Sequence, residues 1–134
     1  IAVLGNIGLQ KGAALLADLG RYLKENQMRL VVIGKVDPAY HPPSIVTVHG
    51  QYDLADLDKI VTNYGITDWL VPSIWPETFS YATHEALATG LPVHAFDIGA
   101  QGDAVSKQPN GHVIACEKDG DLLEGLKGHF KSSL

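Results

Sequence analysis

The stretch DWLVPSIWPETFSYATHEALATGLPVHAFDIG, residues 68–99, contains the pattern that decides the fold of this chain. It begins and ends with short apolar runs, at 68–74 and 91–99, and residues 79–89 between them have a helical pattern that stops at Gly90. Both runs are apolar over nearly their whole length and do not alternate with polar residues. Such runs are typical of strands that are covered on both faces. The stretch therefore predicts a strand–helix–strand unit of a parallel sheet.

The same alternation continues along the rest of the chain. Further strands are predicted at 1–5, 29–34, 44–50 and 111–116. Further helices are predicted at about 11–26, 54–64, 101–107 and 119–132. At 134 residues the chain has the length of one domain. The sequence thus predicts a single α/β domain over residues 1–134, a Rossmann-like, doubly wound parallel sheet of about six strands in a three-layer α/β/α arrangement.

Composition and charge exclude several classes of protein. Hydrophobic residues make up 46% of the chain and charged residues 19%, as in an ordinary globular protein. The formal net charge of −5 argues against a nucleic-acid-binding module, which normally has a basic face. A single cysteine, Cys116, rules out an intrachain disulfide and a cysteine-based zinc site. The histidines lack metal-ligand spacing. His84 and His94 could approach a ligand, but we interpret His49 and His94 as satisfied core or loop histidines.

The apolar runs and the beginning of the sequence indicate where the protein is located in the cell. No apolar run reaches the roughly 18 residues that a membrane span needs, and no secretory signal pattern precedes the first strand. These features predict a cytoplasmic protein. The chain opens directly on a strand without an initiator methionine, so we expect it to be a piece of a longer protein.

The loop GNIGLQKG, residues 5–12, follows the first predicted strand and opens a helix. Backbone N–H groups and the helix dipole can hold an anion at such a position. Glycines such as Gly8 allow close approach of the backbone, and Lys11 is the natural cation for a phosphate. The spacing matches neither G-x-G-x-x-G nor the P-loop pattern. From these residues alone, a solvated lysine on an ordinary turn is an equally good interpretation.

Two carboxylates flank the start of the helix within 68–99. Glu77 precedes the helix and Glu85 lies one to two turns inside it, so their Cα atoms should be roughly 10 Å apart along the axis. Thr78 or Ser80 can cap the helix, whose free N–H groups form a ready phosphate site. Carboxylates on both sides of that site suit a nucleotide sugar, which has hydroxyls on both sides of a diphosphate. The alternative is a surface helix, with Glu77 pairing with the dipole and Glu85 facing solvent.

The segment PSIWPETFSYATHEALATGLPV, residues 72–93, resembles the E-x7-E segment of the GT-B, family-4-type (group 1) retaining glycosyltransferases. The matching positions are Pro72, Ser73, Glu77, Phe79, Glu85, Ala86, Ala88, Gly90, Pro92 and Val93. The segments 4–12, 99–105 and 109–114 resemble further parts of the same donor domain, in order. This resemblance implies an enzyme with two Rossmann-like domains. The chain would be the C-terminal, donor-binding domain, and the N-terminal acceptor domain would be absent from it.

The resemblance also implies a role for each of the charged site residues. Glu85 would bind the ribose hydroxyls, and Glu77 would hold hydroxyls of the transferred sugar near the reacting carbon. Lys11, in the loop that contains Gly8, would neutralise the leaving diphosphate together with the helix N-terminus. Transfer would proceed with retention and with no metal or other cofactor at the diphosphate.

Further donor-binding positions follow from the same resemblance. Thr78, Phe79 and Ser80 would offer backbone N–H groups to the sugar and the diphosphate. Gln51 and Ile74 would line the pocket of the base. The acceptor, a glycan or a lipid-linked glycan, would bind to the missing domain, and any peripheral contact with a membrane would be made through that domain.

The sequence departs from the family pattern at Asn6, where the family usually has an arginine that adds a second cation for the diphosphate. The alternative function is therefore a catalytically impaired nucleotide-sugar-binding or interaction domain of the same fold. A third interpretation, an NAD-type oxidoreductase domain, lacks both G-x-G-x-x-G and an acidic residue at the end of the second strand, where VIGKV stands.

Overall fold

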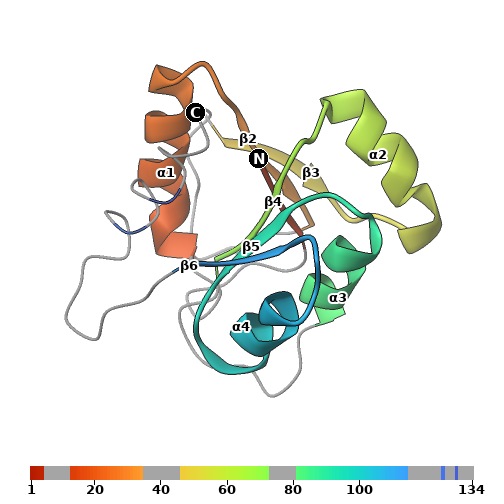
Figure 1. Cartoon of the computed structure of the whole chain (residues 1–134). Helices are drawn as coiled ribbons and strands as arrows, with labels where there is room; N and C mark the ends of the chain where they lie inside the picture. Colours follow the sequence, from red (N-terminus) through yellow and green to blue (C-terminus); the bar gives the residue numbers. More distant parts are fainter. Residues whose placement is uncertain (5–12, 35–45, 73–80, 115–124, 126–128, 130–134) are drawn as a thin grey trace.

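The computed structural model describes residues 1–4, 13–34, 46–72, 81–114, 125 and 129, with the backbone only for 13–17. Figure 1 shows the elements in chain order. They are β1 (Ala2–Leu4), α1 (Ala13–Glu25), β2 (Leu30–Ile33), β3 (Val46–Gly50), the 3₁₀ turn η2 (Leu54–Asp56), α2 (Leu57–Tyr64), β4 (Trp69–Val71), α3 (Tyr81–Ala88), β5 (Val93–Phe96), α4 (Gly99–Ser106) and β6 (Gly111–Ile114).

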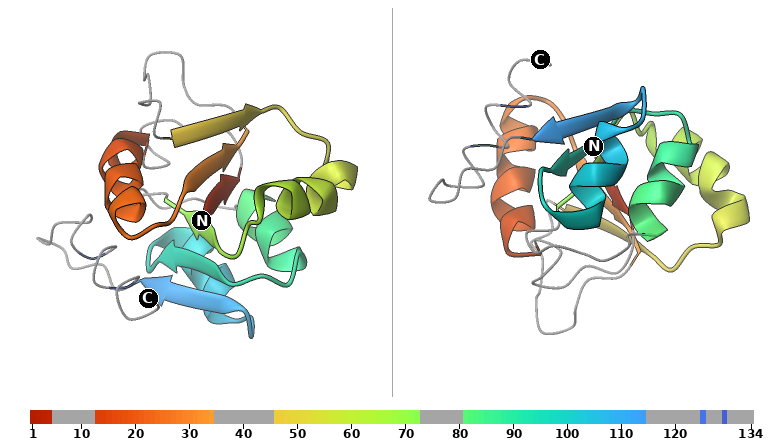
Figure 2. Two further views of the ribbon diagram at one scale, coloured as in Figure 1. Left: turned by 90° about the horizontal axis from the view of Figure 1, so that it is seen from above. Right: turned by 60° about the horizontal axis from the view of Figure 1, so that its bottom comes forward.

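The strands form one six-stranded sheet in the order β3-β2-β1-β4-β5-β6, and every pair of neighbours is parallel. The order reverses between β1 and β4, where Val3 pairs with Leu70. Helix α1 covers one face of the sheet, whereas α2, α3 and α4 lie on the other (Figure 2). The predicted doubly wound, three-layer α/β/α fold is confirmed.

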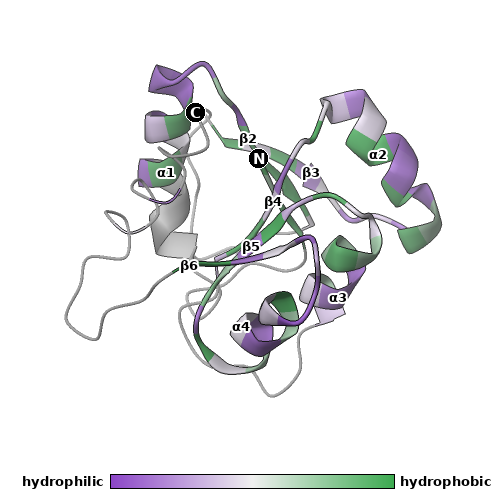
Figure 3. Ribbon diagram, in the orientation of Figure 1, coloured by the Kyte–Doolittle hydropathy of each residue, from purple (hydrophilic) through white to green (hydrophobic). Residues whose placement is uncertain are grey.

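Two apolar clusters, one on each face of the sheet, hold the layers together. Successive residues of a strand point to opposite faces, so Val3 belongs to one cluster while Ala2 and Leu4 belong to the other. The cluster under α1 consists of Ile1, Val3, Leu19, Leu23, Leu30, Val32, Val46, Leu70, Phe96 and Ile114. The cluster under the other helices consists of Ala2, Leu4, Val31, Ile33, Leu57, Ile60, Ile66, Trp69, Val71, Ala86, Val93, Ala95 and Val105. In Figure 3 the helices carry both hydrophobic and hydrophilic residues, as is typical of helices with one face on a core.

The two edge strands of the sheet are more exposed to solvent than the apolar runs predict. In β3 and β6, which have a neighbour on one side only, most side chains reach solvent, and Val48 and Val113 are 42% and 37% exposed. The prediction that every strand is covered on both faces is therefore wrong for these two strands. An apolar run predicts a strand, but it does not show whether the neighbouring layer extends over the edge of the sheet.

Helix boundaries follow local chain chemistry. Gly90 has a φ of +83° and its N–H donates to the carbonyl of Leu87, which is the helix end that the sequence predicts at this glycine. The predicted helix 54–64 begins with the 3₁₀ turn η2 before α2. Of the predicted helix 119–132 only residues 125 and 129 are described, and both are helical.

No helix in the described part of the chain is long and apolar enough to cross a membrane.

Candidate functional site

The carboxyl ends of the strands define one edge of the sheet, where parallel α/β proteins bind their ligands. The chain leaves β1 at Leu4 and β4 at Val71, on neighbouring parallel strands. It leaves β3 at Gly50, on the far side of β2 from β1. The switch point of the sheet therefore lies at the start of the two segments, 5–12 and 73–80, that the sequence singles out.

Two of the predicted site residues, Glu85 and Gln51, lie within the described residues. The others lie outside them, and their roles stay predictions. These are Lys11, Glu77, Thr78, Phe79, Ser80, Asn6, Gly8 and Ile74.

Glu85 lies on α3, which packs against β1, β4 and β5 beside the switch point. Its neighbour Ala86 is buried in the core, whereas Glu85 itself is half-buried. One of its carboxylate oxygens, Oε2, accepts a hydrogen bond of 2.6 Å from the hydroxyl of Tyr52. That length is typical of a hydroxyl that donates to a carboxylate. Glu85 is therefore partly withdrawn from solvent and held by a partner on another element.

Tyr52 follows β3 in the chain and lies two residues after Gly50, the last residue of that strand. The tyrosine packs against the apolar cluster under α2, α3 and α4. Burial raises the pKa of Tyr52, and the hydrogen bond to Glu85 and the negative charge of Glu85 raise the pKa further. The phenol therefore keeps its proton at neutral pH and acts as a donor. Gln51, which the sequence analysis places near the base pocket, precedes Tyr52 in the chain and is exposed.

A pocket of about 390 Å³ lies beside Glu85, between α3 and the beginning of α2. Its lining residues are Leu54, Leu57, Asp58, His84, Glu85, Ala88 and Thr89. Leu54 is 59% exposed, so an apolar surface is open to solvent next to a carboxylate. Such a combination can accept a ligand with a flat apolar part and a hydroxyl-bearing part. Among the described residues, no group of three or more His, Cys, Asp and Glu side chains could hold a metal ion.

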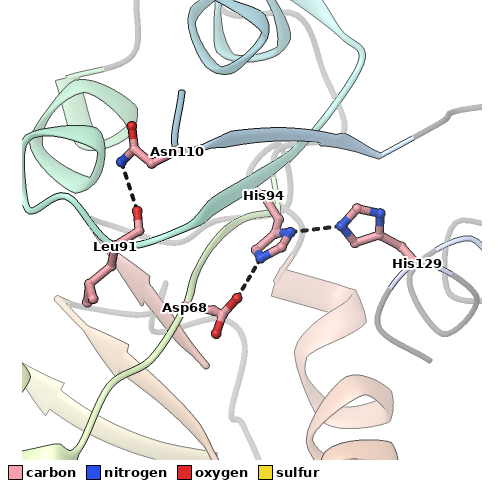
Figure 4. A network of polar contacts seen from close by, with 5 residues as sticks. All are labelled: Asp68, Leu91, His94, Asn110 and His129. Carbon is pink, nitrogen blue, oxygen red and sulfur yellow. Dashed lines mark hydrogen bonds and ion pairs between the residues drawn. The ribbon is translucent and has the colours of Figure 1, made fainter. Parts of the chain in front are cut away.

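A second polar cluster lies at the opposite, amino-terminal edge of the sheet (Figure 4). His94 of β5 donates from Nε2 to Oδ2 of Asp68 at 2.7 Å, and its Nδ1 lies 2.8 Å from Nε2 of His129. The ring of His112 stacks on that of His94 with centroids 5.0 Å apart. Burial lowers the pKa of His94, although Asp68 opposes this shift. His94 is thus a satisfied core histidine, as predicted, and the cluster joins His129 to the sheet.

Known proteins resemble this chain both in fold and in sequence. The fold is shared by solved structures of low sequence identity. The catalytic domain of starch synthase IV from Arabidopsis thaliana, bound to ADP and acarbose, is 19% identical with a TM-score of 0.64, over 98% of this chain and 31% of that one. Sucrose-phosphate synthase from Thermosynechococcus elongatus is 21% identical with a TM-score of 0.62, and the match covers 98% of this chain and 36% of that one. A GtfA/B complex is 13% identical with a TM-score of 0.68, and the match covers 98% of this chain and 28% of that one.

The family itself is shown by the sequence. The model of the family "Glycosyl transferases group 1" matches residues 1–129, so the chain belongs to the group 1 glycosyltransferases. The resemblance to this family and to the GT-B fold is confirmed. A search of curated proteins found no significant match. The chain spans about a third of the length of the similar structures.

Proposed function

We propose that the chain is the donor-binding domain of a glycosyltransferase, which binds a nucleotide-diphosphate sugar for retaining, hexosyl-type transfer. The observation that carries this proposal is the half-buried carboxylate of Glu85, held by Tyr52 on the helix next to the switch point of the sheet. A carboxylate at that place can accept a charge-assisted hydrogen bond from a ribose hydroxyl. The solved starch synthase, which has this fold, is bound to ADP.

The remaining roles complete the proposed reaction. Glu77 holds the transferred sugar, while Lys11 and the N–H groups of Thr78, Phe79 and Ser80 bind the diphosphate and stabilise it as it leaves. No metal is required in this scheme because the lysine and the helix N-terminus supply the positive charge. The acceptor, a glycan or lipid-linked glycan, binds to a second domain outside this chain, and the enzyme works in the cytoplasm.

A screen of UDP-, GDP-, ADP- and dTDP-sugars by thermal shift tests the proposal. A donor that binds stabilises the native state in proportion to the logarithm of its concentration over its dissociation constant. One nucleotide should raise the melting temperature more than the others and thereby identify the base. Failure of every nucleotide diphosphate and nucleotide sugar to stabilise the chain would contradict donor binding.

The 134-residue chain is expected to bind a nucleoside diphosphate and to transfer no sugar. Transfer needs a surface that holds the acceptor and excludes water from the reacting carbon, and we place that surface in the second domain. Titration calorimetry measures the binding, and product analysis with a labelled donor measures transfer. Sugar transfer by the purified 134-residue chain would show that the acceptor site lies within it.

The second candidate function, a binding domain with impaired catalysis, is favoured by Asn6, which leaves Lys11 without the family's usual arginine. Asn6→Arg should tighten nucleoside diphosphate binding by about 1–2 kcal/mol, near tenfold, because a guanidinium can make a bidentate phosphate contact. The affinity should also depend more steeply on salt. Calorimetry with the nucleoside that lacks phosphates is the control, since the gain should largely disappear there. Unchanged affinity in a folded variant would contradict the proposal that the loop 5–12 binds the phosphates.

A further inference from the structure

The contact between Tyr52 and Glu85 joins two elements that are far apart in the chain. The residues are separated by 33 positions, and their side chains meet at 2.6 Å across the space between the exit of β3 and the middle of α3. Tyr52 is anchored through its ring, which packs on the apolar cluster under α2, α3 and α4. The rigid ring therefore fixes the place of its hydroxyl, whereas the side chain of Glu85 has more rotatable torsions.

The hydrogen bond occupies one oxygen of a group that has two. Oε2 of Glu85 accepts from Tyr52, and this bond limits the rotation of the carboxylate about its last torsion. A glutamate that is already ordered loses less rotamer freedom when a ligand binds than one that is free in solvent. The second oxygen, Oε1, is the acceptor that remains for a ligand hydroxyl.

We propose that Tyr52 is a positioning residue for Glu85: its hydroxyl holds Oε2 so that Oε1 is presented to a ribose hydroxyl of the nucleoside diphosphate. This inference rests on the proposed function, because it needs Glu85 to face the ribose. Tyr52 acts through Glu85 in this scheme and does not itself touch the reacting atoms. The high pKa of the phenol fits this role, because the donor proton stays on Tyr52 across the neutral pH range.

The test compares Tyr52→Phe with the unsubstituted chain for pairs of ligands that differ only in the ribose hydroxyls. UDP, GDP and ADP are each paired with their 2′,3′-dideoxy counterparts and titrated by calorimetry. Tyr52→Phe should weaken binding of the ribonucleotide roughly three- to tenfold, the range expected from ordering one flexible side chain. Binding of the dideoxynucleotide should change by no more than about twofold, since it has no hydroxyl for Glu85 to accept.

Tyr64→Phe is the matched control. Tyr64 also packs against the same apolar cluster, and its hydroxyl is engaged by another partner, at 2.8 Å from Nδ1 of His49. The control loses one phenolic oxygen, as the test variant does, and should leave both ligand affinities unchanged. Melting temperatures of both variants show whether they are folded.

The possible outcomes separate the inference from the function on which it rests. If the unsubstituted chain binds no nucleoside diphosphate, the proposed function and the positioning role both fail. If it prefers the ribonucleotide but Tyr52→Phe weakens both ligands equally or neither, the positioning role alone is overturned. A crystal structure of the unsubstituted chain with the ribonucleotide gives an answer that does not depend on the variant. It should keep the contact between Tyr52 and Oε2 with a ribose hydroxyl on Oε1, and a tyrosine displaced from Glu85 would overturn the proposal.

Discussion

Glu85→Gln is expected to weaken nucleoside diphosphate binding by roughly 1.5–3 kcal/mol, the usual worth of a hydrogen bond to a charged group, or roughly 10- to 150-fold in the dissociation constant. A neutral amide accepts hydrogen bonds from a diol less well than a carboxylate does. Glu77→Gln should barely change the affinity for the nucleoside diphosphate but should weaken binding of the intact nucleotide sugar, because we assign Glu77 to the transferred sugar.

Titration calorimetry with both ligands measures these effects. Glu25→Gln is the matched control, since Glu25 ends α1 on the other face of the sheet and is exposed. It changes the net charge by the same amount and should leave both affinities as they are. The reverse pattern, in which Glu77 governs the nucleoside diphosphate and Glu85 governs the sugar, would mean that the donor binds in the opposite orientation.

Gly111→Ala is expected to destabilise the fold by about 3 kcal/mol, at the upper end of what overpacking costs in a packed interior. Gly111 begins β6 at the place where that strand approaches the end of α4. A Cβ atom there would lie 1.8 Å from the carbonyl oxygen of Val105 and 2.6 Å from its carbonyl carbon. The obstacle is backbone, and Val105 is fully buried, so α4 and β6 have to separate to admit the methyl group.

Urea unfolding of Gly111→Ala beside Gly65→Ala separates this clash from the general cost of replacing a glycine. Gly65 follows α2 with a φ of +65°, and a Cβ there meets nothing within 4 Å. The control should lose about 1 kcal/mol, the cost of a left-handed conformation for alanine. Equal losses for the two variants would show that the space between α4 and β6 can widen at little cost.

The elements of the fold could be predicted better than their ends. The run 91–99 predicts a strand, but the observed strand β5 is Val93–Phe96. Leu91 and Ile98, which extend the apolar run at both ends, pack against the two apolar clusters from outside the strand. A buried loop residue and a buried strand residue are both apolar in the sequence. An apolar run therefore predicts which residues are buried more reliably than it predicts where a strand ends.

The candidate site could be predicted where the signal is local and not where it depends on distant contacts. Glu85 stands out because its spacing from Glu77 and from Gly90 is readable within one short segment of the sequence. Tyr52 was missed, although it follows closely on a predicted strand that ends at the ligand-binding edge. Its partner Glu85 is 33 positions away in the sequence, and only the fold brings the two side chains together.

The position of β1 also constrains how the protein can be made. β1 has β2 on one side, which follows soon in the chain, and β4 on the other, where Ala2 pairs with Trp69. Pairings between distant residues form late because closing a long loop costs chain entropy. During synthesis from the amino terminus, β1 therefore has unpaired N–H and C=O groups along one apolar edge until β4 is available. Open edges of this kind invite association with other chains. In the folded chain, β4 covers that edge of β1.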